Sequence, residues 1–170
     1  GRAINTARLI LANNSEKKKP EIIELIGLRE WGYGGYEGRD DNDLWIPLYK
    51  EVNVKFEKDW STWDEFTSKM DDKAIADAIA KNDSTKTAET YDQILIRSKA
   101  AMDQIIEEAT AIGGGKVLVV SHGSEIPTIL EMYAPDEYNG EAIGNVSLSI
   151  LEYQNGKFTL KTIGNLDYLK

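Results

Sequence analysis

One histidine occupies a position where its chemistry could be used. His122 is the only histidine in the sequence, and it follows an apolar run and precedes Gly123 and Ser124. An imidazole between a buried strand and a helix lies where open α/β sheets bind their ligands. The start of such a helix also offers backbone N–H groups and a partial positive charge to an anion such as phosphate. A lone histidine is often an ordinary core or surface residue, but this position favours a site.

Two further residues are candidates on weaker grounds. Arg2 opens a predicted helix, where an isolated arginine is most often a capping or surface charge. Glu30 precedes a loop over 31–38 that is rich in glycine and aromatic residues. A carboxylate held partly out of water in such a loop would suit general acid or base catalysis. Each signal alone is weak, so the argument depends on their order along the chain.

Alternating helix and strand patterns are expected to position these residues. Apolar residues at helical spacing predict helices over 3–12 and 87–111. A short β-branched run predicts a strand over 21–26. The unbroken apolar run within 116–121 predicts a strand buried on both faces. This alternation indicates the α/β class.

The C-terminal part of the sequence predicts a helix and a hairpin. The helix covers 126–133, with Ser124 near its cap. The hairpin pairs 145–153 with 157–163 across Asn155-Gly156, a strong signal for a two-residue turn.

The stretch 39–86 is interpreted as a helical lid inserted into a single domain that covers 1–170. Amphipathic pieces over 60–70 and 73–80 would form it, together with tryptophans. These aromatic side chains have two interpretations at this stage. They could be walls that grip a sugar or nucleoside, or they could be the small core of the lid itself.

Composition limits the possible partners. The chain has 170 residues and a formal net charge of −9, which argues against a nucleic-acid or anionic membrane surface. No apolar run approaches the roughly 18 residues of a membrane span. Cysteine is absent and no cluster of metal ligands is visible, so we expect no metal and no cofactor. The first residues show neither an initiator methionine nor a signal peptide, so the natural start is expected to lie elsewhere and the compartment stays open, with the cytoplasm slightly favoured.

Several motifs together resemble the histidine phosphatase superfamily, the phosphoglycerate-mutase-like proteins. Residues 2–7 resemble its second-arginine motif, in which Arg-Ala is followed by Thr-Ala. Residues 28–38 resemble its segment of Leu-x-Glu, aromatic-Gly and Glu-Gly. Residues 119–123 resemble its second-histidine strand, and 145–153 resemble the closing hairpin of its phosphatase branches. Only the insertion is unmatched.

The resemblance implies a fold and a reaction. The fold would be three-layered, with a mostly parallel central sheet and helices on both faces. The reaction would be hydrolysis of a small phosphorylated substrate through a phosphohistidine, without a metal. Arg2 would clamp the phosphoryl oxygens, His122 would donate to them, and Glu30 would protonate the leaving alkoxide and then activate water.

The resemblance also implies residues that bind the substrate. Gly123 and Ser124 would offer backbone N–H donors to the phosphoryl group, and Tyr33 would line the substrate site.

One part of the family pattern has no counterpart here. An Arg-His-Gly motif that supplies the nucleophilic histidine and ends the first strand is absent from the sequence. We therefore expect the nucleophile to lie upstream of this chain and the chain alone to be inactive. An N-terminal segment or a partner chain is expected to complete the sheet. Alternatives are mutase-type phosphoryl transfer, a non-catalytic phosphate-binding module, and an acidic interaction domain whose motif matches are coincidental.

Overall fold

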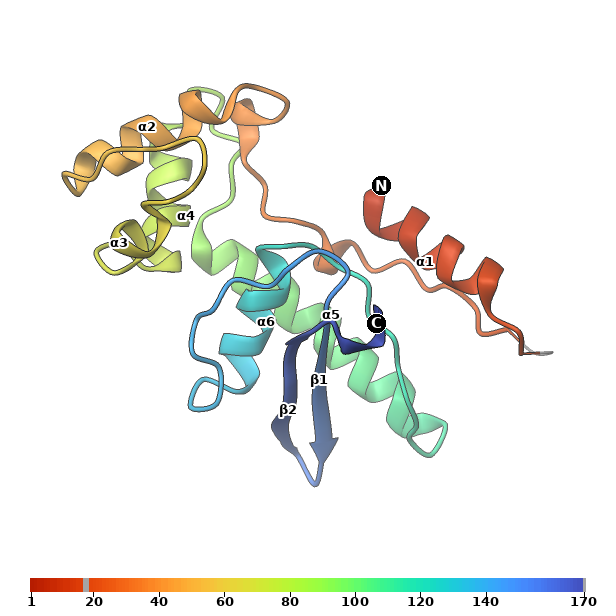
Figure 1. Ribbon diagram of the computed structural model, residues 1–170. Helices are drawn as coiled ribbons and strands as arrows, with labels where there is room; N and C mark the ends of the chain where they lie inside the picture. Colours follow the sequence, from red (N-terminus) through yellow and green to blue (C-terminus); the bar gives the residue numbers. More distant parts are fainter. Residues whose placement is uncertain (17–18, 170) are drawn as a thin grey trace. The chain divides into compact units, whose positions relative to one another are not determined.

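The computed structural model describes residues 1–16 and 19–169, and it divides into two compact units (Figure 1). Unit 1 comprises Gly1–Glu30 and Arg97–Lys170, and unit 2 comprises Trp31–Ile96. The long helix α5 (Tyr91–Ala111) contributes its first residues to unit 2 and the rest to unit 1.

Unit 2 is built mainly from helices, two of which begin at acidic caps. Helices α2 (Asp41–Glu51), α3 (Trp63–Thr67) and α4 (Asp72–Asn82) follow one another. The Asp40 carboxylate accepts the Asn42 N–H at the start of α2, and Asp71 does the same for Ala74 at the start of α4. These bonds satisfy N–H groups that have no partner within the helix. The amphipathic pieces of the sequence correspond to α3 and α4, whereas α2, which contains Pro47, was not predicted.

Aromatic side chains form the core of unit 2. The Phe66 ring is fully buried and stacks on Tyr49 with ring centroids 4.1 Å apart. Trp45 meets Trp60 and Trp63 edge-to-face, each with ring centroids 5.5 Å apart. These are favourable aromatic geometries. Of the two interpretations of the tryptophans, the structure supports the one in which they form a core.

A buried carboxylate organises the loop that follows α4. Asp83 accepts the backbone N–H groups of Thr85, Thr87 and Ala88 at 2.9 Å, and that of Gly35 at 3.1 Å. Burial alone would raise the pKa of Asp83, but the hydrogen bonds from Thr85, Ala88 and Thr87 outweigh it and hold the pKa well below its usual range. The loop over 83–88 is therefore fixed by one ionised side chain.

Unit 1 contains α1, most of α5, and α6. Helix α1 (Arg2–Asn13) matches the predicted helix over 3–12, and none of its residues is buried. Helix α5 matches the prediction over 87–111 except at its start, where Thr90 and Gln93 cap each other's backbone N–H groups. Helix α6 (Glu125–Tyr133) begins one residue before its predicted start.

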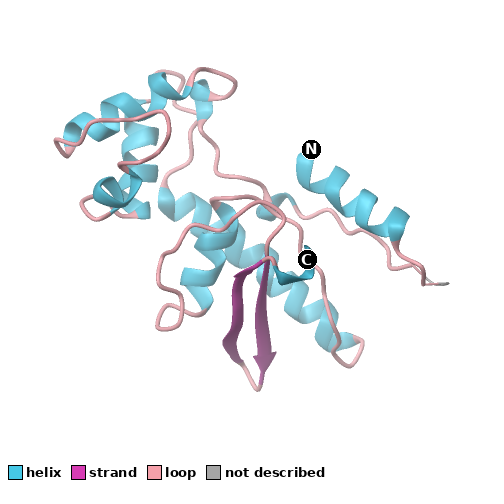
Figure 2. Ribbon diagram, viewed as in Figure 1, coloured by secondary structure: helices cyan, strands magenta, loops and turns pink. Residues whose placement is uncertain are grey.

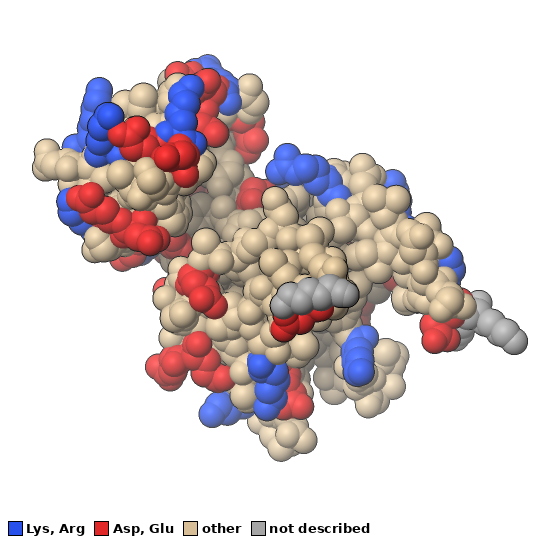
Figure 3. Space-filling model, in the orientation of Figure 1, with Lys and Arg blue, Asp and Glu red and all other residues tan. Residues whose placement is uncertain are grey.

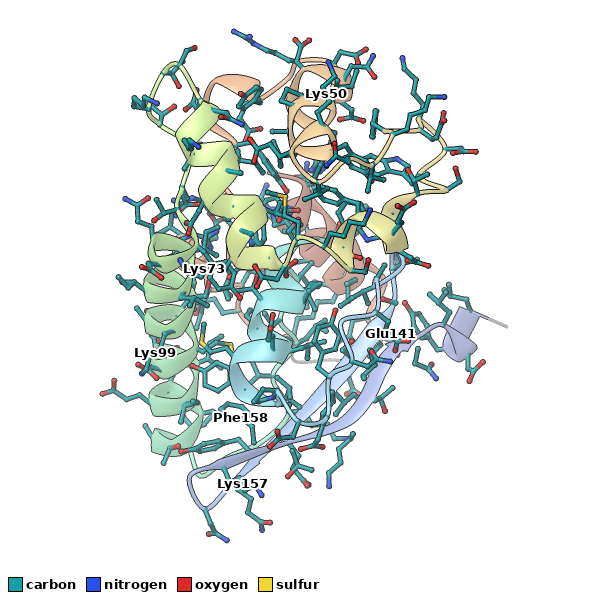
Figure 4. The ribbon with its side chains drawn as sticks, turned by 90° about the vertical axis from the view of Figure 1, so that its left-hand side faces the viewer. Lys50, Lys73, Lys99, Glu141, Lys157 and Phe158 are labelled. Atoms are coloured by element: carbon teal, nitrogen blue, oxygen red, sulfur yellow. The ribbon has the colours of Figure 1, made fainter. Side chains whose placement is uncertain are left out.

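The predicted C-terminal hairpin is confirmed. Strands β1 (Leu148–Gln154) and β2 (Lys157–Asn165) are antiparallel. The two turn residues, Asn155 and Gly156, have φ values of 52° and 80°, as a type I′ turn requires. Phe158 of β2 packs on Tyr133 of α6, with ring centroids 4.5 Å apart (Figure 4).

The expected mostly parallel central sheet is not confirmed. Within the described part of the chain, β1 and β2 are the only strands, and they pair antiparallel (Figure 2). The predicted strands over 21–26 and 116–121 are wrong as strands, because 21–25 and 116–121 have no regular pairing and 26–28 form a short 3-10 turn. A strand exists only where a neighbour supplies backbone partners. These apolar segments find none among residues 1–16 and 19–169, so Ile23, Val117 and Leu118 remain 55–60% exposed.

No helix in the described ranges combines the length and the apolar character needed to cross a bilayer.

Candidate active site

His122 lies at the junction between an irregular segment and α6. Its carbonyl accepts the Ile126 N–H at 3.0 Å, which ties the histidine to the first residues of α6. The His122 residue is half-buried. Just before it, the Ser121 hydroxyl donates to the Leu28 carbonyl at 2.8 Å. This bond ties the segment that carries His122 to the segment that leads to Glu30.

Glu30 meets the start of α6. The backbone N–H of Ser124 donates to the Glu30 carboxylate, with nitrogen–oxygen distances of 3.2 Å to Oε1 and 3.4 Å to Oε2. A helix N-terminus favours a carboxylate at this place. The structure therefore brings Glu30 together with the segment His122-Gly123-Ser124. The bonded residues, Glu30 and Ser124, are 94 positions apart in the sequence.

The same bond refines the expected role of Ser124. Its N–H was expected to donate to a phosphoryl oxygen, but in the structure it donates to Glu30. Gly123 is exposed, and a Cβ built on it would meet no heavy atom within 4 Å. The Gly123 backbone is therefore open to solvent on this side.

Arg97 is a functional candidate that sequence reasoning missed. Its guanidinium donates from Nη1 to the carbonyls of Gly27 at 2.7 Å and Arg29 at 3.0 Å, and from Nη2 to the carbonyl of Glu30 at 3.2 Å. One side chain of α5 thereby holds the backbone of the whole segment that ends at Glu30.

Glu125 is the acidic partner of Arg97 and was also missed. Its Oε2 accepts from Arg97 Nη1 at 2.9 Å, and its Oε1 accepts from the Ser98 hydroxyl at 2.6 Å. Burial raises the pKa of Glu125 to about 7, although the bonds from Ser98 and Arg97 act in the opposite direction. The available sequence signal was slight: an acidic residue in the first turn of a helix resembles an ordinary helix-end charge.

Arg2 and Tyr33 are the two other predicted site residues. Arg2 is exposed in the first turn of α1, and its side chain makes no hydrogen bond or ion pair with residues 1–16 or 19–169. Tyr33 belongs to unit 2, where it packs against the core and its N–H donates to Glu37. The roles of Arg2 and Tyr33 at the site stay predictions.

Across residues 1–16 and 19–169, no group of three or more His, Cys, Asp or Glu side chains is placed to hold a metal ion.

Comparison with known proteins identifies the class of the fold. The chain is similar to the crystal structure of a phosphoglycerate mutase from Bacillus anthracis strain Sterne, with a TM-score of 0.84 and 34% sequence identity. The match covers 99% of this chain and 70% of that chain. No curated protein matches the chain. The fold is thus an α/β fold of the phosphoglycerate mutase type.

The family follows from a second comparison. The sequence model of the histidine phosphatase superfamily (branch 1) matches residues 1–166. The chain belongs to this superfamily, as its motifs had indicated. Membership supports phosphoryl transfer through a phosphohistidine as the general chemistry.

Proposed function

We propose that the full-length protein hydrolyses small phosphomonoesters through a phosphohistidine intermediate. The observation that carries this proposal is the hydrogen bond from Ser124 N–H to the Glu30 carboxylate. It joins the acid–base candidate to the histidine segment of the family. The bonded N–H belongs to the second residue after His122, with the exposed Gly123 between them, and in this proposal the carboxylate held there serves the leaving group of a bound phosphoester.

The proposed reaction has two displacements at phosphorus. In the first, the nucleophilic histidine forms a bond to phosphorus, the bond to the leaving oxygen breaks, and protonated Glu30 gives that oxygen its proton. In the second, Glu30 takes a proton from water, the water oxygen bonds to phosphorus, and the phosphohistidine bond breaks to release phosphate. His122 and Arg2 stabilise the negative charge on the transferring phosphoryl oxygens.

We also propose that the nucleophilic histidine comes from outside these 170 residues, because His122 is the only histidine and matches the family's second one. Its segment would enter as a strand, from the same protein or from a partner chain. Two features support this part of the proposal. The segment 116–121 is unpaired along an apolar run, and its Val117 and Leu118 side chains are exposed. A strand docked there would satisfy backbone groups and cover these side chains.

A mutase reaction is the second candidate, and the similar Bacillus anthracis phosphoglycerate mutase favours it. A mutase returns the phosphoryl group to a bound substrate and must keep water away from the phosphohistidine. A phosphatase must admit water. The two candidates use the same residues of this chain and differ in the acceptor.

The test measures both activities of the full-length protein. We expect hydrolysis of p-nitrophenyl phosphate and of β-glycerophosphate, and no interconversion of 2- and 3-phosphoglycerate. Glu30→Gln should lower kcat for β-glycerophosphate by about 10²–10⁴-fold, the usual contribution of a general acid. Glu21→Gln, an exposed carboxylate outside the site, is the matched control and should leave kcat unchanged.

Other outcomes assign other functions. Interconversion without hydrolysis would identify a mutase. Phosphate binding without either activity would identify a binding module. Unchanged turnover in Glu30→Gln would remove Glu30 from the mechanism.

A further inference from the structure

A closed ring of interactions surrounds Glu30 at both its ends. Its carbonyl accepts from Arg97 Nη2, and its carboxylate accepts from the Ser124 N–H. Arg97 in turn binds Glu125, which is the residue directly after Ser124 in the chain. The ring therefore runs from the Glu30 backbone through Arg97 and Glu125 to Ser124, and back to the Glu30 carboxylate. It joins α5, the start of α6 and the segment 27–30.

The interior of this ring is nearly closed to water. The side chains of Arg97 and Glu125 are 11% and 0% exposed, and Ser98 is also fully buried. A buried charge that loses its partner is strongly destabilised, so the position of each member depends on the others. The planar guanidinium can donate to several acceptors at once in a fixed geometry, whereas a lysine ammonium is a compact charge without this fork of donors.

The segment 27–30 lies directly against α5, which lets Arg97 reach three of its carbonyls. Gly27 permits this approach, because a Cβ built there would overlap the Arg97 carbonyl and lie 2.8 Å from the Ala101 Cβ. The backbone of Gly27 is buried as a result. The segment thus has little freedom to shift unless Arg97 moves with it.

We infer that Arg97, oriented by Glu125 and Ser98, is a positioning residue that sets the Glu30 carboxylate against the start of α6. The inference rests on the proposed role of Glu30 and deepens it. Arg97 does not touch the phosphoester. It acts through the backbone of Glu30, while Glu125 ties the same guanidinium to α6, whose cap residue Ser124 holds the carboxylate through its N–H.

This arrangement predicts a kinetic signature that depends on the leaving group. A misplaced general acid slows reactions in which the leaving oxygen needs a proton. The alkoxide of β-glycerophosphate needs one, whereas p-nitrophenolate is stable without one. A variant that only loosened the fold would slow both substrates alike. The ratio of the two kcat values therefore separates positioning from structural damage.

The experiment compares three variants of the full-length protein. Arg97→Lys should lower kcat for β-glycerophosphate by about 10- to 100-fold, as expected for a reacting group misplaced by about 1 Å, and should change kcat for p-nitrophenyl phosphate less than about 3-fold. Ser98→Ala, a milder change in the same ring, should show the same pattern more weakly. Lys99→Gln is the control on the same helix, because it removes only an exposed ion pair with Asp103 (Figure 4).

A second measurement needs no turnover. The Ser124 amide should exchange its proton about 3- to 10-fold faster in Arg97→Lys, since its bond to Glu30 weakens, while amides in the second turn of α6 keep their rates. Amide exchange can be measured whether the protein is a phosphatase, a mutase or a binding module. A poorly folded variant would show fast exchange throughout α6. In that case Ser98→Ala decides.

The outcomes separate this inference from the proposed function. If Glu30→Gln leaves the ratio of kcat values unchanged, Glu30 is not the general acid, and the proposed role of Glu30 on which this inference rests fails. If Glu30→Gln changes the ratio but Arg97→Lys and Ser98→Ala change neither the ratio nor Ser124 exchange, the positioning inference alone is overturned.

Discussion

Units 1 and 2 bury different kinds of side chain. Unit 2 buries rings and aliphatic side chains around Phe66 and Tyr49, and charged side chains of both signs lie on the face shown in Figure 3. Within the described residues, unit 1 buries few apolar side chains: Ala101, Met102, Ile129, Leu130 and Ala134. It adds the polar Ser98, Glu125 and Thr128. Unit 2 is therefore stabilised by a core of its own, whereas much of what unit 1 buries holds the candidate site.

The two units also use a buried carboxylate in opposite ways. Asp83 of unit 2 accepts backbone N–H groups, and its pKa is lowered. Glu125 of unit 1 is removed from water by its surroundings, and its pKa is raised to about 7 in spite of Arg97. A carboxylate surrounded by donors is stable as an anion, whereas one buried with a single cationic partner is close to neutrality at physiological pH.

Among substitutions that test this difference between the units, Phe66→Ala is expected to have the largest effect on stability. The ring is fully buried and stacked, so its removal should cost about 3–5 kcal/mol of unfolding free energy. All four tryptophans lie in unit 2, so tryptophan fluorescence during urea denaturation measures this unit. Phe158→Ala in unit 1 is the control and should leave that transition in place. An equal shift in both variants would show that the cores are not separate.

Asp83→Asn should have the next largest effect on the stability of unit 2. An amide oxygen accepts fewer and weaker hydrogen bonds than the ionised carboxylate, so the loop over 83–88 should loosen. Because the pKa of Asp83 is lower in the folded state, its stabilisation is fully present above about pH 4 and is lost as the pH falls further. The variant should lose this acid sensitivity in fluorescence-monitored melts. Asp64→Asn, an exposed acid on α3, should keep it.

Gly27→Ala tests how tightly segment 27–30 lies on α5. The added methyl group would overlap the Arg97 carbonyl, so we expect a cost of about 1–3 kcal/mol in unit 1. Amide exchange of α6 measures it. At Gly144 a Cβ would lie 3.9 Å from Leu166, an ordinary contact, so Gly144→Ala should be tolerated. Equal tolerance of both changes would contradict the close packing.

The smallest effect concerns the pH response of unit 1. Because the pKa of Glu125 is raised on folding, its contribution to stability is fully present below about pH 4.5 and is lost as the pH rises to about 7. Glu125→Gln should flatten this dependence, lowering by a few degrees the difference in thermal midpoint between pH 5 and 8. Circular dichroism melts at both pH values measure it. A slope unchanged by the substitution would assign the dependence to other groups.

The helices and the hairpin were predictable because their signals are local. The Asn155-Gly156 turn needs only its own two residues to adopt positive φ values, and the helical period of α5 is visible along the sequence. The strands predicted over 21–26 and 116–121 failed because pairing is not a local property. Val117 and Leu118 have strand-forming character, but no described segment pairs with them.

The site was predictable in part for a similar reason. Glu30 and His122 were found through motifs, and the structure brings their segments together. Arg97 and Glu125 belong to no such motif, and each looks like a common surface charge in its own helix. Only the meeting of α5 with the start of α6 makes them a buried pair, and that contact is tertiary.

The apolar segment over 116–121 has a consequence for handling the protein. Val117-Leu118-Val119-Val120 is uncharged, contains no proline, is rich in β-branched residues, and has no strand partner within the described residues. Such a stretch is a template for intermolecular cross-β pairing. The chain by itself is therefore expected to aggregate with increasing concentration, and a charged substitution at exposed Leu118 is the simplest way to slow this self-association.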